Sequence, residues 1–303
     1  MDFVQEIVSI DEQTRTATFR LIPDPKRYEW KEGSEGRYLY DKLDNAIIPE
    51  AVFSEAIKSI KGMPIYYQPQ KIGDAEQYVK SRIPFIQDRL LGKTGATSLA
   101  DKSEEFLQSL PVNELSFVIM CVDIAGSTRL ATTIPAEQYA NLISTVLYEI
   151  SAIIPHFHGH VLKYTGDGLI AYFPEPSFIV KNDLALYCAL TVKRLVYEGL
   201  NPILKQNGYP DIDIRAGLDS GEAYIVTMGS PNTKSHKDII GSIVSLAAKV
   251  QHLGKSGDIL MGEVTERNLH TNWREICSEV KLENDWQYKN AEGAPYKVYK
   301  LNS

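Results

Sequence analysis

The sequence predicts a mixed α+β fold, and three observations support this prediction. The apolar segment FVIMCV at 117–122 is typical of a buried strand, and it ends at a carboxylate, Asp123. Residues 135–154 repeat apolar side chains at helical spacing, which indicates a helix with one face in a core. The apolar segments at 161–164 and 169–173 flank a glycine-containing turn and indicate two paired strands. This order of elements favours helices packed on a sheet.

The composition is that of a globular protein with a mild excess of acidic residues. The chain has 303 residues, 32 Lys and Arg against 39 Asp and Glu, and a net charge of −7. This balance argues against a broad nucleic-acid-binding face but leaves room for a local basic pocket. No apolar run approaches the roughly 18–20 residues of a membrane span, and the first residues do not resemble a signal peptide. We therefore expect a cytoplasmic protein with neither nucleic acid nor membrane as a partner.

Residues 1–112 are predicted to form an N-terminal α/β region of unassigned role, and residues 113–303 a second domain. Within the first region the expected elements are a strand at 14–22, a helix beginning with Pro49 in its first turn and running to about Ile60, a strand at 63–68, a helix at 75–91 that breaks before Pro84, and a helix at 100–110. The break follows from the restriction that proline places on the residue before it.

Two aspartates are candidate metal ligands. Asp123 is followed by a tight turn at 124–128, and Asp167 lies in the turn Thr165–Gly168. The order strand, helix, hairpin brings the second turn beside the end of the first strand. Two aspartates placed in this way can hold two divalent ions, which stabilise the attacking and leaving oxygens in phosphoryl transfer. An isolated Asp in a glycine turn is more often structural, so the pairing is what favours a metal site.

Residues 241–250 are predicted to form a helix with a polar face. Ser242, Ser245 and Lys249 stand at i, i+3 and i+7, so their side chains share one side of the helix. A hydroxyl and an ammonium on one side suit a ribose and a phosphate. The alternative is an ordinary solvated helix face.

Two other motifs receive no role. His156, His158 and His160 alternate along the chain, but no carboxylate or cysteine stands at ligand spacing, and Gly159 is expected to make the turn into the next strand. Ser220 in GLDSG lacks both a strand–turn–helix context and a paired histidine, so it is not assigned as a nucleophile.

Four motifs, in this order and spacing, resemble the class III nucleotide cyclases, the adenylate/guanylate cyclase catalytic domain. They are VDIAGSTRL (122–130), GHVLKYTGDGLIAYF (159–173), IRAGLDSGEAYIV (214–226) and KDIIGSIVSLAAKV (237–250). The resemblance covers roughly residues 115–300 and excludes the N-terminal region. It implies a ferredoxin-like βαββαβ core that works as a head-to-tail homodimer, with two active sites that each use residues from both subunits.

The resemblance assigns the metal and phosphate ligands. Asp123 and Asp167 match the two metal-binding aspartates, which implies two divalent ions, Mn²⁺ or Mg²⁺, with the backbone carbonyl of Ile124 as a further ligand. The turn that holds the β- and γ-phosphates is matched by the backbone amides of Ala125, Gly126, Ser127 and Thr128.

The remaining matches concern the triphosphate and the base. Arg215 matches an arginine that contacts the triphosphate, and Lys289 in YKNAEG matches a phosphate-binding lysine after a gap of one residue. Lys163 matches a base-contacting lysine supplied by the partner subunit, and Asp238 matches its companion.

Two positions depart from the family pattern. The family usually has Asn at Ser245, where it orients the ribose, and Arg at Lys249, where it stabilises the pentacoordinate phosphorus. Lysine supplies charge but not the bidentate fork of arginine. Both metal-binding aspartates are retained, so catalytic activity is expected, with Ser245 and Lys249 in these roles.

The implied reaction converts a nucleoside triphosphate to a 3′,5′-cyclic nucleotide and diphosphate by two-metal catalysis. Asp123, Asp167 or water takes the proton of the ribose 3′-OH, and the sequence leaves these alternatives open. A Lys163–Asp238 pair can donate to a ring nitrogen and accept from an exocyclic amine, which suits adenine and also cytosine, whereas uracil would need a donor to O4.

The architecture favours a pyrimidine. A stand-alone cyclase domain with Ser and Lys at the two exchanged positions is similar to the bacterial pyrimidine cyclases of the Pycsar anti-phage systems, which make cyclic UMP or cyclic CMP for a downstream effector. We expect a pyrimidine cyclase of this kind first and an adenylate cyclase second. The third hypothesis is a catalytically silent module that binds nucleotide and regulates a partner.

Overall fold

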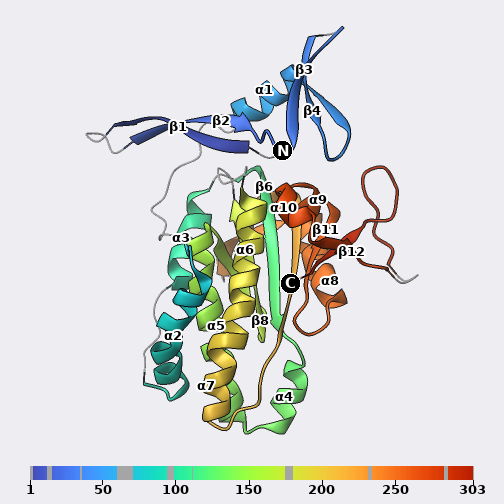
Figure 1. Cartoon of the computed structure of the whole chain (residues 1–303). Coiled ribbons are helices and arrows are strands. Elements are labelled where there is room, and N and C mark those ends of the chain that lie inside the picture. Colours follow the sequence, from blue (N-terminus) through green and yellow to red (C-terminus); the bar gives the residue numbers. More distant parts are fainter. Residues whose placement is uncertain are drawn as a thin grey trace.

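The computed structural model describes residues 3–11, 16–34, 36–59, 71–93, 99–110, 112–174, 180–230, 234–282 and 286–302. Figure 1 shows a central sheet with long helices on one side, and a smaller N-terminal part beyond one end of that sheet. The strand predicted at 63–68 lies outside the described residues. None of the helices that these residues form is both long enough and apolar enough to span a bilayer.

The central sheet has the strand order of a ferredoxin-like fold. Its elements, in chain order, are β6 (Glu114–Ile124), α5 (Ala136–Ile153), β7 (His160–Tyr164), β8 (Gly168–Pro174), a continuous helical segment of α6 (Lys181–Arg194), η3 (Leu195–Leu200) and α7 (Asn201–Gln206), and β9 (Ile214–Ser230). The strands lie side by side in the order β9, β6, β8, β7, and each pair is antiparallel. The predicted α+β fold with a βαββαβ core is confirmed.

The sheet continues beyond β9. The additional elements are β10 (Lys234–Ile240), α8 (Ser242–Leu253), β11 (Ile259–Gly262), α9 (Glu263–Arg267), α10 (Thr271–Arg274), β12 (Cys277–Glu279) and β13 (Val298–Leu301). β10 pairs with β9 as a hairpin, and β11 lies parallel to β9 because α8 provides the crossover. Two short helices lie between β6 and β7, namely α4 (Ser127–Thr133) before α5 and η1 (Ile154–Phe157) after it.

Strand β6 separates two hydrophobic clusters. Val118, Met120 and Val122 belong to the cluster formed with α5 and α6, whereas Phe117 and Ile119 belong to the cluster formed with α8 and β10. Successive side chains of a strand point to opposite faces, so both faces of β6 are buried. This arrangement explains the unbroken apolar run in the sequence, because a strand covered on both sides has no polar face.

Two helices that precede the predicted domain boundary complete these clusters. Arg82 of α2 (Ala75–Leu90) makes two hydrogen bonds of 2.8 Å to the buried carboxylate of Glu149 in α5. Phe106 of α3 (Leu99–Ser109) is buried in the cluster under α8. The packed unit therefore includes residues from before the predicted boundary, and the division at 112/113 stays a prediction.

Helix α2 runs through Pro84 without the break that the sequence predicted. Proline in a helix interior costs about 3 kcal/mol. Val79, Ile86 and Leu90, on both sides of Pro84, are buried in one cluster, and fully burying such a side chain contributes about 1.5–3 kcal/mol. Three such contributions exceed the cost, and Pro84 itself lies on the exposed side of the helix.

The N-terminal elements form two small sheets and a helix. They are β1 (Phe3–Asp11) paired with β2 (Thr16–Pro23), then β3 (Tyr28–Gly33), β4 (Gly36–Asp41) and β5 (Ala46–Pro49), followed by α1 (Glu50–Ser59). Pro49 is thus the last residue of a strand, and the prediction that it enters the helix was wrong by one residue. The buried guanidinium of Arg27 bonds to Asp41 at 2.9 Å and to the carbonyl of Arg267 at 2.7 Å, which links this part to the C-terminal half.

The HFHGH segment ends a helix and turns into β7. His158, not Gly159, takes the left-handed conformation, with φ of 62°. A Cβ on Gly159 would lie 2.6 Å from the Phe173 ring and 2.8 Å from Ile154. Gly159 closes the predicted turn with its backbone N–H, which donates to the carbonyl of Ile154 at 3.1 Å, and close packing excludes a side chain there.

Asp219 of β9 is a fully buried carboxyl group. It accepts a hydrogen bond of 2.6 Å from the Tyr296 hydroxyl, and its second oxygen has no partner among the described residues. Burial raises the pKa of Asp219 to about 7, against an ordinary value of 3.8. Because the folded-state pKa lies above the unfolded value, this group supports folding fully only below about pH 4, and that support is lost as the pH rises through about 7.

We expect Asp219→Asn to stabilise the protein more at pH 8 than at pH 5. The amide keeps an oxygen that can accept from Tyr296, but it carries no charge to bury at pH 8. Urea denaturation of both proteins at both pH values measures the difference. An equal change in unfolding free energy at pH 5 and pH 8 would show that Asp219 does not titrate between them.

Candidate active site

The structure brings Asp123 and Asp167 together at the end of β6. Asp123 pairs in register with Gly168, the residue after Asp167. The backbone N–H of Ile124 donates to the carbonyl of Asp167 at 3.2 Å. The strand end and the hairpin turn are thus joined by sheet pairing and by one further backbone hydrogen bond.

Gly168 permits this close approach. A Cβ at this position would lie 2.3 Å from the carbonyl oxygen of Val122 and 2.9 Å from the Cβ of Asp123. Gly166 has a φ of 95° in the same turn, which side chains rarely adopt. The two glycines of the TGDG motif are therefore explained by the turn that presents Asp167.

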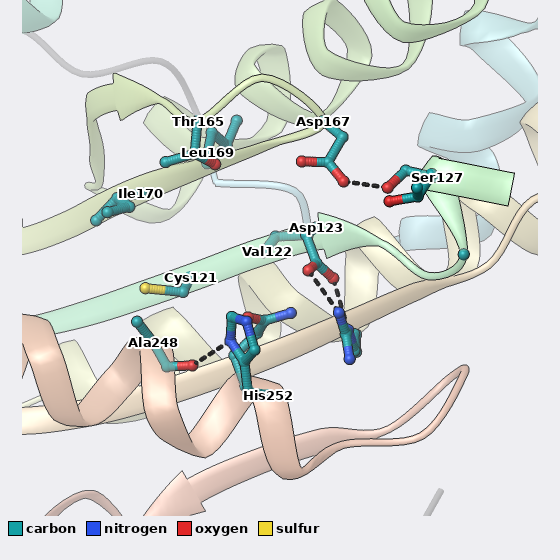
Figure 2. Close-up of a pocket in the computed structure, with 14 residues that line it drawn as sticks. Cys121, Val122, Asp123, Ser127, Thr165, Asp167, Leu169, Ile170, Ala248 and His252 are labelled. Atoms are coloured by element: carbon teal, nitrogen blue, oxygen red, sulfur yellow. Dashed lines mark hydrogen bonds and ion pairs between the residues drawn. The ribbon is translucent and has the colours of Figure 1, made fainter. Parts of the chain in front are cut away.

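Each carboxylate has a neighbour that occupies its oxygens. Arg215, directly opposite Asp123 on β9, donates from Nε at 2.9 Å and from Nη2 at 3.0 Å to the two oxygens of Asp123. The hydroxyl of Ser127 donates to Asp167, as Figure 2 shows. The hydrogen bond with Asp123 is the main reason that the pKa of Arg215 is raised above its usual value.

The two aspartates line a cavity of about 490 Å³. Its other polar side chains are Ser127 and Thr128 at the start of α4, Thr165 of the hairpin turn, Arg215 of β9, and Gln251 and His252 of α8. Burial, and then the charge of Asp123, raise the pKa of Cys121 in the cavity wall to about 12. The thiol is therefore neutral near pH 7 and does not act as a nucleophile.

Sequence reasoning missed Gln251 and His252. They follow Ala248, which also lines the cavity, at i+3 and i+4, so the three lie on one side of α8. The sequence prediction instead concerned a different side of this helix, the one that carries Ser245 and Lys249. The helical spacing from Ala248, a small residue facing the sheet, is the signal that would have found them.

Only part of the predicted phosphate-binding turn lines the cavity. Gly126, Ser127 and Thr128 line the cavity. The amide of Ala125 instead donates to the carbonyl of Asp213 at 2.8 Å, because the backbone pairing of β6 with the β9 side continues past Ile124. The Ala125 amide is therefore engaged within the protein, which differs from its predicted phosphate role.

Lys163 and Asp238 also come together, but at a different place. Lys163 Nζ lies 2.7 Å from Asp238 Oδ2, and the backbone N–H of Ile239 donates to the other oxygen at 2.9 Å. Lys163 lines a second cavity, of about 290 Å³, whose lining does not include the two metal-binding candidates.

The remaining predicted residues lie elsewhere on the protomer. Ser245 and Lys249 are exposed on α8, and neither lines the cavity with Asp123, although other residues of that helix do. Lys289 lines a third cavity, of about 750 Å³, near β13. A single protomer thus holds the predicted site residues in separate groups.

The donor set of the first group fits divalent metal ions. Carboxylate, carbonyl and water oxygens suit Mg²⁺ and Mn²⁺, and Mg²⁺ is usually held by one or two carboxylates together with substrate phosphates. Across the described ranges no group of three or more His, Cys, Asp or Glu side chains is placed to hold a metal. Asp123 and Asp167 are thus suited to metals that arrive with a phosphorylated ligand, provided that Arg215 releases Asp123.

Comparison with known proteins identifies the family and agrees with the fold. The family model described as the adenylate and guanylate cyclase catalytic domain matches residues 112–302. The chain belongs to this family. The solved structures of the guanylyl cyclase Cya2 and of the adenylyl cyclase CyaB from P. aeruginosa share the fold. Each superposes with a TM-score of 0.54 over 63% of this chain, covering 94% and 96% of those chains, at 17% and 21% identity.

Curated relatives within the family differ in the base that their names specify. A cytidylate cyclase from Escherichia coli is 27% identical over 205 residues, which cover 61% of this chain and 43% of that protein. Adenylate cyclase type 10 from Oryctolagus cuniculus is 27% identical over 176 residues, which cover 55% of this chain and 10% of that protein. The match spans less than half the length of both relatives.

We expect Gly168→Ala to separate the two carboxylates. The new methyl group would collide with the backbone of Val122, and the hairpin must shift to relieve this contact. Displacement of supporting groups typically weakens metal binding by about 10- to 100-fold, and calorimetric titration with Mn²⁺ measures it.

Gly73→Ala is the matched control, because a Cβ there meets nothing within 4 Å. It should leave Mn²⁺ affinity unchanged. Unchanged affinity in Gly168→Ala as well would contradict the close approach as a requirement of the site.

Proposed function

We propose that the protein is a nucleotidyl cyclase that converts a nucleoside triphosphate to a 3′,5′-cyclic nucleotide and diphosphate. The observation that supports this most strongly is the Asp123–Asp167 pair, held by β6–β8 pairing beside the 126–128 turn. Family membership supports the reaction class. Because the curated relatives are matched over less than half of their length, the activity of this chain is a proposal.

Asp123 and Asp167 would hold two divalent ions, Mn²⁺ or Mg²⁺, with the Ile124 carbonyl as a further ligand. When bound, such ions supply charge stabilisation at the α-phosphate and lower the pKa of the ribose 3′-OH. The turn at 126–128 would contact the β- and γ-phosphates. Asp123, Asp167 and water remain the alternatives that accept the 3′-OH proton.

Arg215 would release the carboxylate of Asp123 and bind phosphate oxygens of the substrate instead. It now holds both oxygens of Asp123 in a bidentate ion pair, and the same planar fork matches two phosphate oxygens. When a triphosphate and its metals enter, Arg215 can turn to the phosphates and leave Asp123 to the metal. The ion pair therefore keeps the carboxylate oriented before substrate binds.

The complete site would need two copies of the chain in head-to-tail arrangement. Lys163, which bonds to Asp238, lines a different cavity from Asp123, and Ser245 and Lys249 are exposed on α8. A second protomer can bring these residues to the metal-binding half. Lys249 would stabilise charge on the α-phosphate and Ser245 would orient the ribose, while Lys289 would contact phosphate.

The base is proposed to be a pyrimidine, giving cyclic CMP or cyclic UMP. The Lys163–Asp238 pair offers one cationic donor and one anionic acceptor, which match the O2 or N3 and the N4 amine of cytosine. The cytidylate cyclase among the relatives points the same way. Adenine remains the second candidate, because its ring nitrogen and exocyclic amine present the same two kinds of group.

The biological role follows from the proposed product. A cyclic pyrimidine nucleotide would signal to a downstream effector in the cytoplasm, in anti-phage defence.

A different class of function, a silent nucleotide-binding regulatory module, is favoured by one observation only. Ser245 and Lys249 replace the usual ribose-orienting Asn and phosphate-binding Arg.

We expect a cyclic pyrimidine nucleotide and diphosphate when the pure protein is incubated with the four ribonucleoside triphosphates and Mn²⁺ or Mg²⁺. Asp123→Asn and Asp167→Asn should each lower the rate by at least about 10²–10³-fold, because each removes charge at the developing transition state. Asp88→Asn, an exposed carboxylate on α2, is the control that should retain full activity. Mass spectrometry identifies the product.

If cyclic AMP is the sole product, the proposed pyrimidine base is wrong, but the proposed cyclase activity is supported. Nucleotide binding without any cyclic product would favour the regulatory module. Full activity in either aspartate variant would contradict the metal site.

A further inference from the structure

Helix α3 contacts both strands that supply the predicted base-reading pair. Lys163 belongs to β7 and Asp238 belongs to β10. In the described sheet β7 pairs with β8 and β10 pairs with β9, so neither pairing joins β7 to β10 directly. The relative position of Lys163 and Asp238 therefore depends on contacts outside the sheet hydrogen bonds.

The contact of α3 with β7 is both polar and aromatic. The hydroxyl of Ser103 accepts a hydrogen bond of 3.1 Å from the backbone N–H of Val161. The ring of Phe106 stacks on His160 with centroids 3.9 Å apart and planes at 5°. Both contacts fix the first half of β7, which leads directly to Lys163.

The β7–β8 pairing is irregular between these contacts and Lys163. Val161 pairs with Ala171, but Lys163 pairs with Ile170, so one residue is inserted at Leu162. A bulge of this kind changes the direction in which the following side chain points. The direction of Lys163 is thus set immediately after the residues that α3 contacts.

The contact of α3 with β10 is made by Lys237. Its ammonium group donates to two carbonyls at the C-terminal end of α3, Gln108 at 2.7 Å and Leu110 at 2.5 Å. A cation suits this end of a helix, where backbone carbonyls lack helical partners. The next residue, Asp238, is the acceptor that bonds to Lys163.

These contacts enclose a cavity of about 290 Å³ between α3, β7 and β10. Glu104 and Leu107 of α3 line it together with Lys163, Tyr164 and Lys237. A helix that precedes the family match at residues 112–302 therefore forms one wall of the space beside the base-reading pair.

We propose that Lys237 is a positioning residue for base selection, which holds Asp238 in place relative to Lys163 through helix α3. Lys237 fixes the end of α3 to β10, and Ser103 and Phe106 fix the same helix to β7. Movement of α3 changes the distance between Lys163 and Asp238. This inference rests on the proposed cyclase function, because base selection is measured through the reaction.

The test is the relative kcat/KM for the four triphosphates in Lys237→Met, which keeps the aliphatic chain but loses both hydrogen bonds. We expect the preference for the best base over the next to fall by about tenfold, and Lys237→Arg to restore it. Lys42→Met is the matched control. Lys42 makes the same type of contact, 2.6 Å to the carbonyl of Pro25, at a site that does not involve α3.

The outcomes separate this inference from the proposed function. Wild-type protein that makes no cyclic nucleotide overturns the cyclase proposal. Active wild-type protein, with a Lys237→Met variant that keeps its base preference or loses activity equally with every triphosphate, overturns the role of Lys237. If Lys237→Met does not fold, as judged by its thermal transition, Ser103→Ala tests the β7 side of the same helix and should change base preference in the same way.

Discussion

The antiparallel pairing of β6 with β8 is the constraint on which the candidate site depends. It sets Asp123 opposite Gly168 and so brings Asp167 to the end of β6, where the Ile124 amide bonds to the Asp167 carbonyl. Both faces of β6 are buried, and a slip by one residue would move every apolar side chain to the other cluster. Core packing therefore fixes the register, and the register fixes the distance between the two carboxylates. The proposed metal site is built in this way on a strand that is buried on both faces.

The sequence was informative where one local signal determined the structure. The apolar run before Asp123, the glycines around Asp167 and the periodic segment at 135–154 predicted a strand, a hairpin turn and a helix, because each pattern allows few alternatives. The βαββαβ core was implied by the resemblance of four motifs to the class III cyclases. Predictions were wrong where packing outweighed local preference, as when α2 continued through Pro84. Gln251 and His252 were missed because their place in the cavity depends on how α8 lies on the sheet, and no short segment encodes that orientation.

The distribution of polar groups over one protomer explains why this fold would act as a pair. The half with Asp123, Asp167 and Arg215 can hold metals and phosphates, but Lys249 is exposed to solvent and lies outside that cavity. Lys163, which bonds to Asp238, lines a separate cavity next to helix α3. The residues proposed for phosphate binding and those proposed for base recognition thus lie in different parts of the chain. A symmetric dimer would join the two surfaces twice, at two equivalent sites.

Mixing two inactive variants tests this two-copy site most directly. Each proposed site takes Asp123 from one subunit and Lys249 from the other. Asp123→Ala removes the first contribution from both sites of its homodimer and Lys249→Ala removes the second, so each homodimer should be inactive. After subunit exchange, half of the dimers are mixed and each has one intact site of two, so we expect about one quarter of wild-type activity. Native mass spectrometry verifies that mixed dimers have formed. Mixed dimers without activity, or a fully active monomer, would contradict the shared site.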